Sequence, residues 1–138
     1  MKIAICGSMT FAKEMLNVAS RLSKRGHICH LPEETEKYVT GEVKIIGDKI
    51  GASRKIEADL INKHYHKIKD SDAVLVLNYD KKGIKNYIGG NSFLEMGFAY
   101  VLGKKIFLLN EVPDLGFLRE EVLAMKPIII GNKLSSIS

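Results

Sequence analysis

The sequence predicts an α/β fold with three layers, in which helices cover both faces of a parallel sheet of about five strands. Short apolar runs alternate with longer segments of helical period, which is the pattern of βαβ units. The run Ala73–Asn78 (AVLVLN) is apolar at every position before its last, as expected of a central parallel strand. The 138 residues suffice for one hydrophobic core, and no linker or repeat divides them. We therefore expect residues 1–138 to form one domain of Rossmann-like or flavodoxin-like type.

The expected strands are short and end at turn residues. Lys2–Cys6 stops at a Gly-Ser pair, and Ile28–Leu31 is closed by a proline. Ala73–Asn78 is the strongest strand, and Lys105–Leu109 and Ile128–Ile130 complete the set.

The expected helices are amphipathic or wholly apolar segments. Their bounds are Phe11–Arg25, Ile56–Lys69, Asn91–Leu102 and Phe117–Met125. Gly26 and Gly103 follow the first and third of these, as C-terminal cap glycines do.

The segment Glu33–Lys55 is polar, charged and weakly patterned. We interpret it as a long loop or lid, with a short element around Val43–Ile46. Long loops in compact domains are usually functional or disordered, so we expect it to be mobile or to cover part of the site.

The composition is that of an ordinary globular protein. The net charge of +5 suits an anionic ligand such as a phosphate, or simply a soluble surface. The basic residues form no run interleaved with aromatics, so we expect no long nucleic acid as a partner. No apolar run is long enough for a membrane span, and the opening MKIAICGS is too short for a signal peptide. We expect a cytoplasmic protein without membrane contact, in which Cys6 and Cys29 are free, buried thiols.

The binding crevice is expected beyond the carboxyl ends of the strands, where open α/β sheets bind their ligands. This rule brings together Gly7-Ser8-Met9, Asn78, the loop Tyr79–Gly90 and the start of the third helix.

Glu95 is the one charged residue in NSFLEMGFAYVL. A carboxylate on a buried helix is costly unless it is partnered or functional, so Glu95 is a candidate catalytic residue in the first turn. The spacing Ser92-x-x-Glu95 also matches a capping box, in which Glu95 would bind the backbone N–H of Ser92. Both interpretations stay open on spacing alone.

Two glycine-containing turns are candidate anion sites. Gly89-Gly90-Asn91-Ser92 precedes the third helix, and Gly7-Ser8 follows the first strand. Either could equally be a plain turn with an N-cap. Neither has the dinucleotide or P-loop fingerprint, so no cofactor is expected. Lys81, Lys82 and Lys85 could screen a phosphate or form a solvated face.

Metal and hydrolase motifs are missing from the sequence. There is no H-E-x-x-H, no C-x-x-C and no nucleophile elbow, and residues two apart, such as His64 and His66, point to different faces of a helix. We expect no metal site.

ICGSM, SDAVLVLN and GGNSFLEMGFAYVLGKKIFLL, in this order, resemble the nucleoside 2-deoxyribosyltransferase superfamily, which includes the 2'-deoxynucleoside 5'-phosphate N-hydrolases. The specific blocks are the G-S-hydrophobic turn and Glu95-Met-Gly97-Phe-Ala99. The resemblance implies that Glu95 is the nucleophile at the anomeric carbon of a (deoxy)ribose. It also implies that Gly7, Ser8 and Met9 face sugar or phosphate, and that Asn91 and Ser92 line the sugar and its 5' end. It further suggests a homodimer or higher homo-oligomer, with Phe98 and Tyr100 available for an interface.

The sequence also departs from this superfamily. His64 stands where the superfamily has an acidic residue, and Gly89 stands where the transferases have an Asp used in handling the base. The hydrolases have a phosphate-binding Ser near there, for which Ser92 is the nearest match, while Phe93 and Leu94 replace loop glycines. We therefore expect an enzyme that cleaves or exchanges the N-glycosidic bond of a (deoxy)nucleoside or nucleoside 5'-monophosphate, with hydrolysis somewhat favoured over transfer and with His64 as a catalytic helper.

Two alternatives remain. The first is a non-catalytic module that binds a nucleotide or sugar phosphate on the same fold. The second is a base-releasing enzyme related to the cytokinin-activating phosphoribohydrolases, whose GG…T-x-x-E block the segment Gly89-Gly90…Ser92-x-x-Glu95 loosely resembles.

Overall fold

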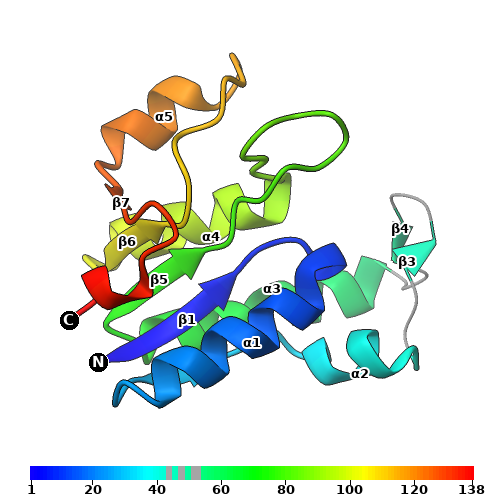
Figure 1. Ribbon diagram of the computed structural model, residues 1–138. Helices are drawn as coiled ribbons and strands as arrows, with labels where there is room; N and C mark the ends of the chain where they lie inside the picture. Colours follow the sequence, from blue (N-terminus) through cyan, green and yellow to red (C-terminus); the bar gives the residue numbers. More distant parts are fainter. Residues whose placement is uncertain (43–44, 47–48, 51–53) are drawn as a thin grey trace.

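The computed structural model describes residues 1–42, 45–46, 49–50 and 54–138. Its main sheet has five parallel strands in the order β2-β1-β5-β6-β7 (Figure 1). Taken in chain order, these strands are arranged 2-1-3-4-5, the flavodoxin-like order, so the predicted fold class is confirmed. The strands are β1 (Lys2–Cys6), β2 (Ile28–His30), β5 (Ala73–Val76), β6 (Lys105–Leu108) and β7 (Ile128–Ile129).

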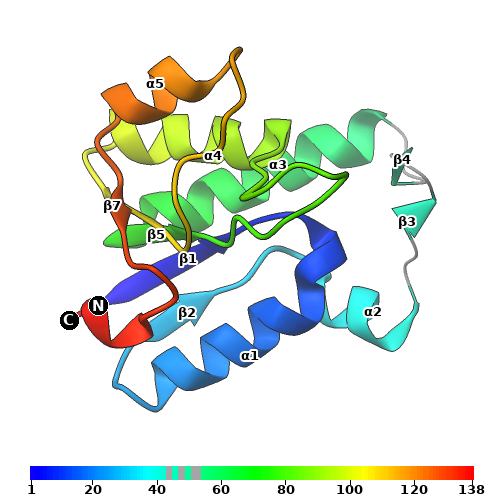
Figure 2. The ribbon, with the colours of Figure 1, turned by 45° about the horizontal axis from the view of Figure 1, so that its top comes forward.

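The two faces of the sheet carry separate hydrophobic clusters, because successive side chains of a strand point to opposite faces. Ile3 and Ile5 of β1 belong to a cluster with helix α1 (Ala12–Ser23). Ala4 and Cys6 belong to a cluster with three helices that cover the other face, namely α3 (Arg54–Lys69), α4 (Gly90–Val101) and α5 (Arg119–Ala124). Figure 2 shows the sheet between these two layers.

The segment after β2 is more regular than the sequence indicated. Helix α2 occupies Thr35–Thr40, and Gly41 ends it with a φ of 84°, a left-handed conformation that suits glycine. The prediction of a loop is therefore wrong for residues 35–40. Six residues are too few for an amphipathic period to show, which is why the helix was missed.

A small antiparallel hairpin follows α2, made of β3 (Ile45–Ile46) and β4 (Lys49–Ile50). Part of the short element expected around Val43–Ile46 is therefore present as β3, while residues 43–44 lie outside the described residues. Mobility of this segment stays a prediction.

His27 contacts both Met1, directly before β1, and Ile137 near the end of the chain. Its Nδ1 lies 3.0 Å from the Met1 amine and its Nε2 lies 3.3 Å from the carbonyl oxygen of Ile137. In the part of the chain that the structure describes, no helix has the length and apolarity to cross a bilayer.

Candidate functional site

A cavity of about 420 Å³ opens at the carboxyl ends of β1 and β5. This volume is in the range of small-molecule sites. Its walls come from the turn after β1, the β2–α2 segment, helix α3, the β5–α4 loop and the start of α4. The described lining residues are Gly7, Ser8, Met9, Thr10, Pro32, Glu33, Tyr38, Leu60, Ile61, His64, Lys81, Lys82, Tyr87, Gly89, Gly90, Asn91, Ser92, Leu94 and Glu95.

Most of the residues singled out in the sequence lie together in this cavity. The turn Gly7-Ser8-Met9 faces the segment Gly89–Ser92, with His64 and Glu95 in the same lining. The backbone at Gly7 lies close to α1, because a Cβ there would lie 3.2 Å from Cε of Met15 and the methionine would have to shift.

Asn78 lies outside the cavity lining and is fully buried. Its Nδ2 donates to the carbonyl oxygens of Asn110 and Glu111, both at 3.0 Å, and its Oδ1 accepts from the backbone N–H of Asn110 at 2.9 Å. The side chain therefore joins the ends of β5 and β6, and its part in substrate binding stays a prediction.

Glu95 does not form the capping box that its spacing allowed. Helix α4 begins at Gly90 with Gly89 as its N-cap, so Glu95 lies in the second turn and not in the first. Its side chain is 15% exposed and turns toward the cavity. The helix starts one residue earlier than expected because Gly89, with extended φ and ψ of −84° and 174°, can serve as the cap.

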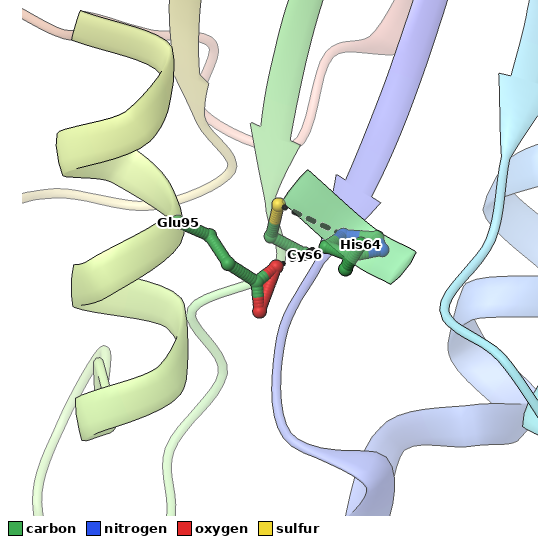
Figure 3. A group of neighbouring side chains, drawn as sticks. All are labelled: Cys6, His64 and Glu95. Atoms are coloured by element: carbon green, nitrogen blue, oxygen red, sulfur yellow. Dashed lines mark hydrogen bonds and ion pairs between the residues drawn. The ribbon is translucent and has the colours of Figure 1, made fainter. Parts of the chain in front are cut away.

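Glu95 converges with two other side chains from different elements (Figure 3). Glu95 Oε2 lies 2.9 Å from Nε2 of His64 on α3, and the same Nε2 lies 3.6 Å from Sγ of Cys6 at the end of β1. The short contact between Oε2 and Nε2 lacks the alignment of a hydrogen bond. Burial, together with the nearby charge of Glu95 and a hydrogen bond to its carboxylate, raises the pKa of the Cys6 thiol well above its usual range.

A second polar group lies at the turn after β1. Nζ of Lys81 donates to Oγ of Ser8 at 2.7 Å and lies 5.7 Å from the centre of the Tyr87 ring. Ser8 Oγ also accepts from the backbone N–H of Thr10 at 3.3 Å. Lys81 and Lys82 thus bring positive charge to this part of the lining, whereas Lys85 is not among the described lining residues.

Lys67 fixes the wall formed by the β2–α2 segment. Its Nζ donates to the carbonyl oxygen of Leu31 at 2.6 Å and lies 3.0 Å from Oε1 of Glu33. The hydrogen bond and charge of Lys67 lower the pKa of the Glu33 carboxyl. Residues from the predicted lid therefore do line the site, namely Glu33 and Tyr38.

Sequence reasoning missed the part that Cys6 takes in the site. Its state is as expected, because Cys6 is a free, fully buried thiol, while Cys29 is free but only partly buried. One available signal was its place as the last residue of β1, directly before the turn that lines the cavity. No signal in the sequence indicated Lys67, whose partners lie on another element.

The comparisons with known proteins give similarity at the level of structure. No family model matches the chain, and no curated protein matches it in sequence. CMP N-glycosidase BcmB from Clostridium botulinum superposes with a TM-score of 0.55 at 17% identity, over 96% of this chain and 90% of that one. The 2-deoxyribosyltransferase from Leishmania mexicana superposes with a TM-score of 0.52 at 18% identity, over 79% of this chain and 65% of that one.

The chain shares its fold with these two enzymes. It spans less than two thirds of the length of the Leishmania protein.

Within the deoxyribosyltransferase fold, two of the sequence departures line the cavity. His64 is 6% exposed and contacts Glu95 directly. At Gly89 a Cβ would lie 3.2 Å from Cε1 of Tyr87. The Tyr87 ring therefore takes the space in which a longer side chain at position 89 would begin.

Proposed function

We propose that this protein is an enzyme that cleaves or exchanges the N-glycosidic bond of a (deoxy)nucleoside or nucleoside 5'-monophosphate, with Glu95 as the nucleophile. The observation that carries this proposal is a largely buried carboxylate that opens onto a cavity of about 420 Å³ in a deoxyribosyltransferase fold. The cavity has room for one nucleotide-sized ligand.

The first chemical step is attack on the anomeric carbon. A carboxylate oxygen of Glu95 forms a bond to C1' while the bond from C1' to the base nitrogen breaks, through an oxocarbenium-like transition state. The electron pair leaves with the base, which takes up a proton. His64, within 2.9 Å of the carboxylate, orients the nucleophile and is a candidate for moving that proton.

The second step resolves the glycosyl–enzyme ester. In hydrolysis, water attacks C1' and gives up one proton, for which His64 is the candidate acceptor, while the bond to Glu95 breaks and returns the free carboxylate. Hydrolysis is favoured over base exchange because Gly89 supplies no carboxylate to handle an incoming base, and because Tyr87 lies against it.

Ser8 and Lys81 are the groups best suited to the 5' end of the substrate. The hydroxyl and ammonium lie 2.7 Å apart in the cavity lining, and together they can bind a 5'-phosphate or a 5'-hydroxyl. Gly89, Gly90, Asn91 and Ser92, at the start of α4, complete the proposed substrate site. The small-molecule partner is thus a nucleoside or nucleotide.

The deciding experiment uses metal-free protein and a panel of ribo- and deoxyribonucleosides with and without 5'-phosphate. Released base is measured by chromatography for wild type, Glu95→Gln and Glu121→Gln, the last being a control on an exposed helical glutamate outside the cavity. Glu95→Gln should lower base release by at least about 10³-fold, since a covalent nucleophile has no substitute. Glu121→Gln should match wild type. Full activity in Glu95→Gln would refute the assignment of the nucleophile.

A binding module for nucleotides or sugar phosphates is the alternative, favoured by one observation. Glu95 is engaged by His64 and Cys6, which would suit a carboxylate with a structural part. Saturable binding of a nucleotide without base release during long incubation would support the module. A cytoplasmic location and a homodimer or larger assembly remain predictions.

A further inference from the structure

Three potential metal ligands meet beside the cavity, whose described lining includes His64 and Glu95 but not Cys6. Sγ of Cys6, Nε2 of His64 and a carboxylate oxygen of Glu95 all lie within 4.8 Å of one another. Among the described residues this is the one such group of three His, Cys, Asp or Glu side chains. The three come from β1, α3 and α4, which the core holds in place, so the group is set by the fold and not by a loop (Figure 3).

The arrangement differs from a catalytic relay. In a triad the imidazole uses one ring nitrogen for the nucleophile and the other for the orienting group. In this protein the thiol and the carboxylate both approach Nε2, and the buried Nδ1 has no partner among the described residues. The thiol and the carboxylate thus converge on one ring nitrogen, and a cation between them would be bound by all three ligand atoms.

The separation of sulfur and nitrogen fits a tetrahedral ion. With Zn–S bonds of about 2.3 Å and Zn–N bonds of about 2.0–2.1 Å, tetrahedral angles separate sulfur from nitrogen by roughly 3.5 Å and nitrogen from oxygen by roughly 3.3 Å. The corresponding separations are 3.6 Å and 2.9 Å. The first separation matches the tetrahedral value, and the second is shorter than it, so the Glu95 carboxylate must move away from His64 when an ion binds.

The thiol must lose its proton to bind a metal. Burial and the carboxylate oppose this loss in the absence of a cation. A divalent ion reverses the balance, because a coordinating thiol is deprotonated and its proton passes to solvent.

We propose that Cys6, His64 and Glu95 bind Zn²⁺, with the fourth coordination position open to the cavity. Cysteine, histidine and glutamate are the side chains that zinc prefers, and three protein ligands with one open position are typical of accessible zinc sites. The bound ion engages the carboxylate that would attack C1', so zinc inhibits base release. This second part rests on the proposed function, whereas the binding of zinc does not.

Metal binding is tested by adding Co²⁺ and Zn²⁺ to chelator-treated protein. Wild type should bind one equivalent of Co²⁺ with the absorption of a thiolate–cobalt bond, and Zn²⁺ should displace it. Cys6→Ser and Cys6→Ala should lose that absorption and bind Zn²⁺ more than about 100-fold more weakly, beyond what loss of an outer-shell partner costs. Glu95→Gln should weaken binding while it keeps the thiolate absorption.

Cys29→Ser is the matched control, because it removes the other free cysteine. It should bind both metals as wild type does. Circular dichroism checks that each variant is folded. No binding by wild type, or loss of the absorption in Cys29→Ser but not in Cys6→Ser, would overturn the proposal.

The two proposals fail in different ways. If metal-free protein releases base but binds no metal, the zinc site is wrong and the proposed function stands. If the protein binds zinc through Cys6 but releases no base from any substrate without metal, the site stands and the proposed function falls. If both hold, added Zn²⁺ should suppress base release in wild type and leave Cys6→Ser much less inhibited.

Discussion

The contact between His64 and Glu95 makes two opposite demands on one carboxylate. An attacking oxygen must be free to reach C1', yet Oε2 lies 2.9 Å from the imidazole of His64. The two demands agree if His64 holds one oxygen while the other attacks, which is how a positioned nucleophile gains rate through orientation.

We expect His64→Ala to lower turnover by roughly 10²-fold, the low end of the range for general acid–base groups. Steady-state rates of base release provide the measurement. His66→Ala is the control, because this neighbour on α3 is exposed and outside the cavity lining. Equal rates for His64→Ala and wild type would reduce His64 to a packing residue.

The raised pKa of Cys6 makes the stability of the metal-free protein depend on pH. The folded protein keeps the thiol proton at pH values at which the unfolded chain has lost it. The contribution of Cys6 to the free energy of unfolding is therefore complete below about pH 8.5 and declines above it. The loss approaches about 1.4 kcal/mol per pH unit. Denaturant unfolding at pH 7.5 and 9.5 should show a smaller decline for Cys6→Ser than for Cys29→Ser. Identical declines would contradict the assignment to Cys6.

At the scale of elements, the site depends on how strand ends are held. Asn78 follows β5 and bonds to the chain after β6, while Asn132, after β7, donates to Oδ1 of Asn110 at 2.6 Å. These amides connect three neighbouring strand ends beside the cavity without entering it.

Asn78→Ala should destabilise the fold by roughly 1–3 kcal/mol, because it leaves partly buried backbone groups of Asn110 and Glu111 without their side-chain partner. Thermal unfolding measures the loss. The KM of the folded variant should stay within a few-fold of wild type, since Asn78 lies outside the cavity lining. Asn132→Ala, which removes the more exposed hydrogen bond to Asn110, should lower the free energy of unfolding by much less. A large rise in KM with unchanged stability would return Asn78 to the substrate site.

The elements with strong local patterns were predictable from the sequence. Lys2–Cys6 has the predicted bounds, and helix α4 differs from its prediction by one residue at each end. Glu95 was found because a charge on an apolar helix is conspicuous. The contact of Cys6 with His64 at the site was not predicted, because in a sequence a buried cysteine cannot be told from any other small apolar residue. The structural use of Asn78 also escaped, because its partners are backbone groups after another strand.

At the scale of the whole molecule, the outer side of α4 is unusually apolar. Val101 is 84% exposed and Tyr100 is 56% exposed. Phe98, which the sequence also offered for an interface, instead packs edge-on against Tyr65 with ring centres 5.2 Å apart. Tyr100 and Val101 are therefore the better candidates for contact with a second copy.

If a homo-oligomer forms through α4, Val101→Glu should convert it to a monomer, because a charge at the centre of an apolar interface is costly. Light scattering after size exclusion measures the mass. Leu123→Glu, at an exposed apolar position on α5, serves as the control and should not change it. A wild-type monomer, or an unchanged oligomer in Val101→Glu, would exclude this interface.

The described cavity lining begins at Gly7 and ends at Glu95. Strands β6 and β7 and helix α5, all later in the chain, give it no residue, although β6 contributes to both hydrophobic clusters and α5 to one of them. The residues up to Glu95 thus include those that line the cavity, whereas the residues after Glu95 contribute to the packing of the fold and not to the described lining. Solvent-exposed apolar positions after Glu95, such as Phe117 and Ile128, are open to stabilising replacement without the usual trade-off against activity. Substitutions that raise the free energy of unfolding should therefore be sought in the last third of the chain.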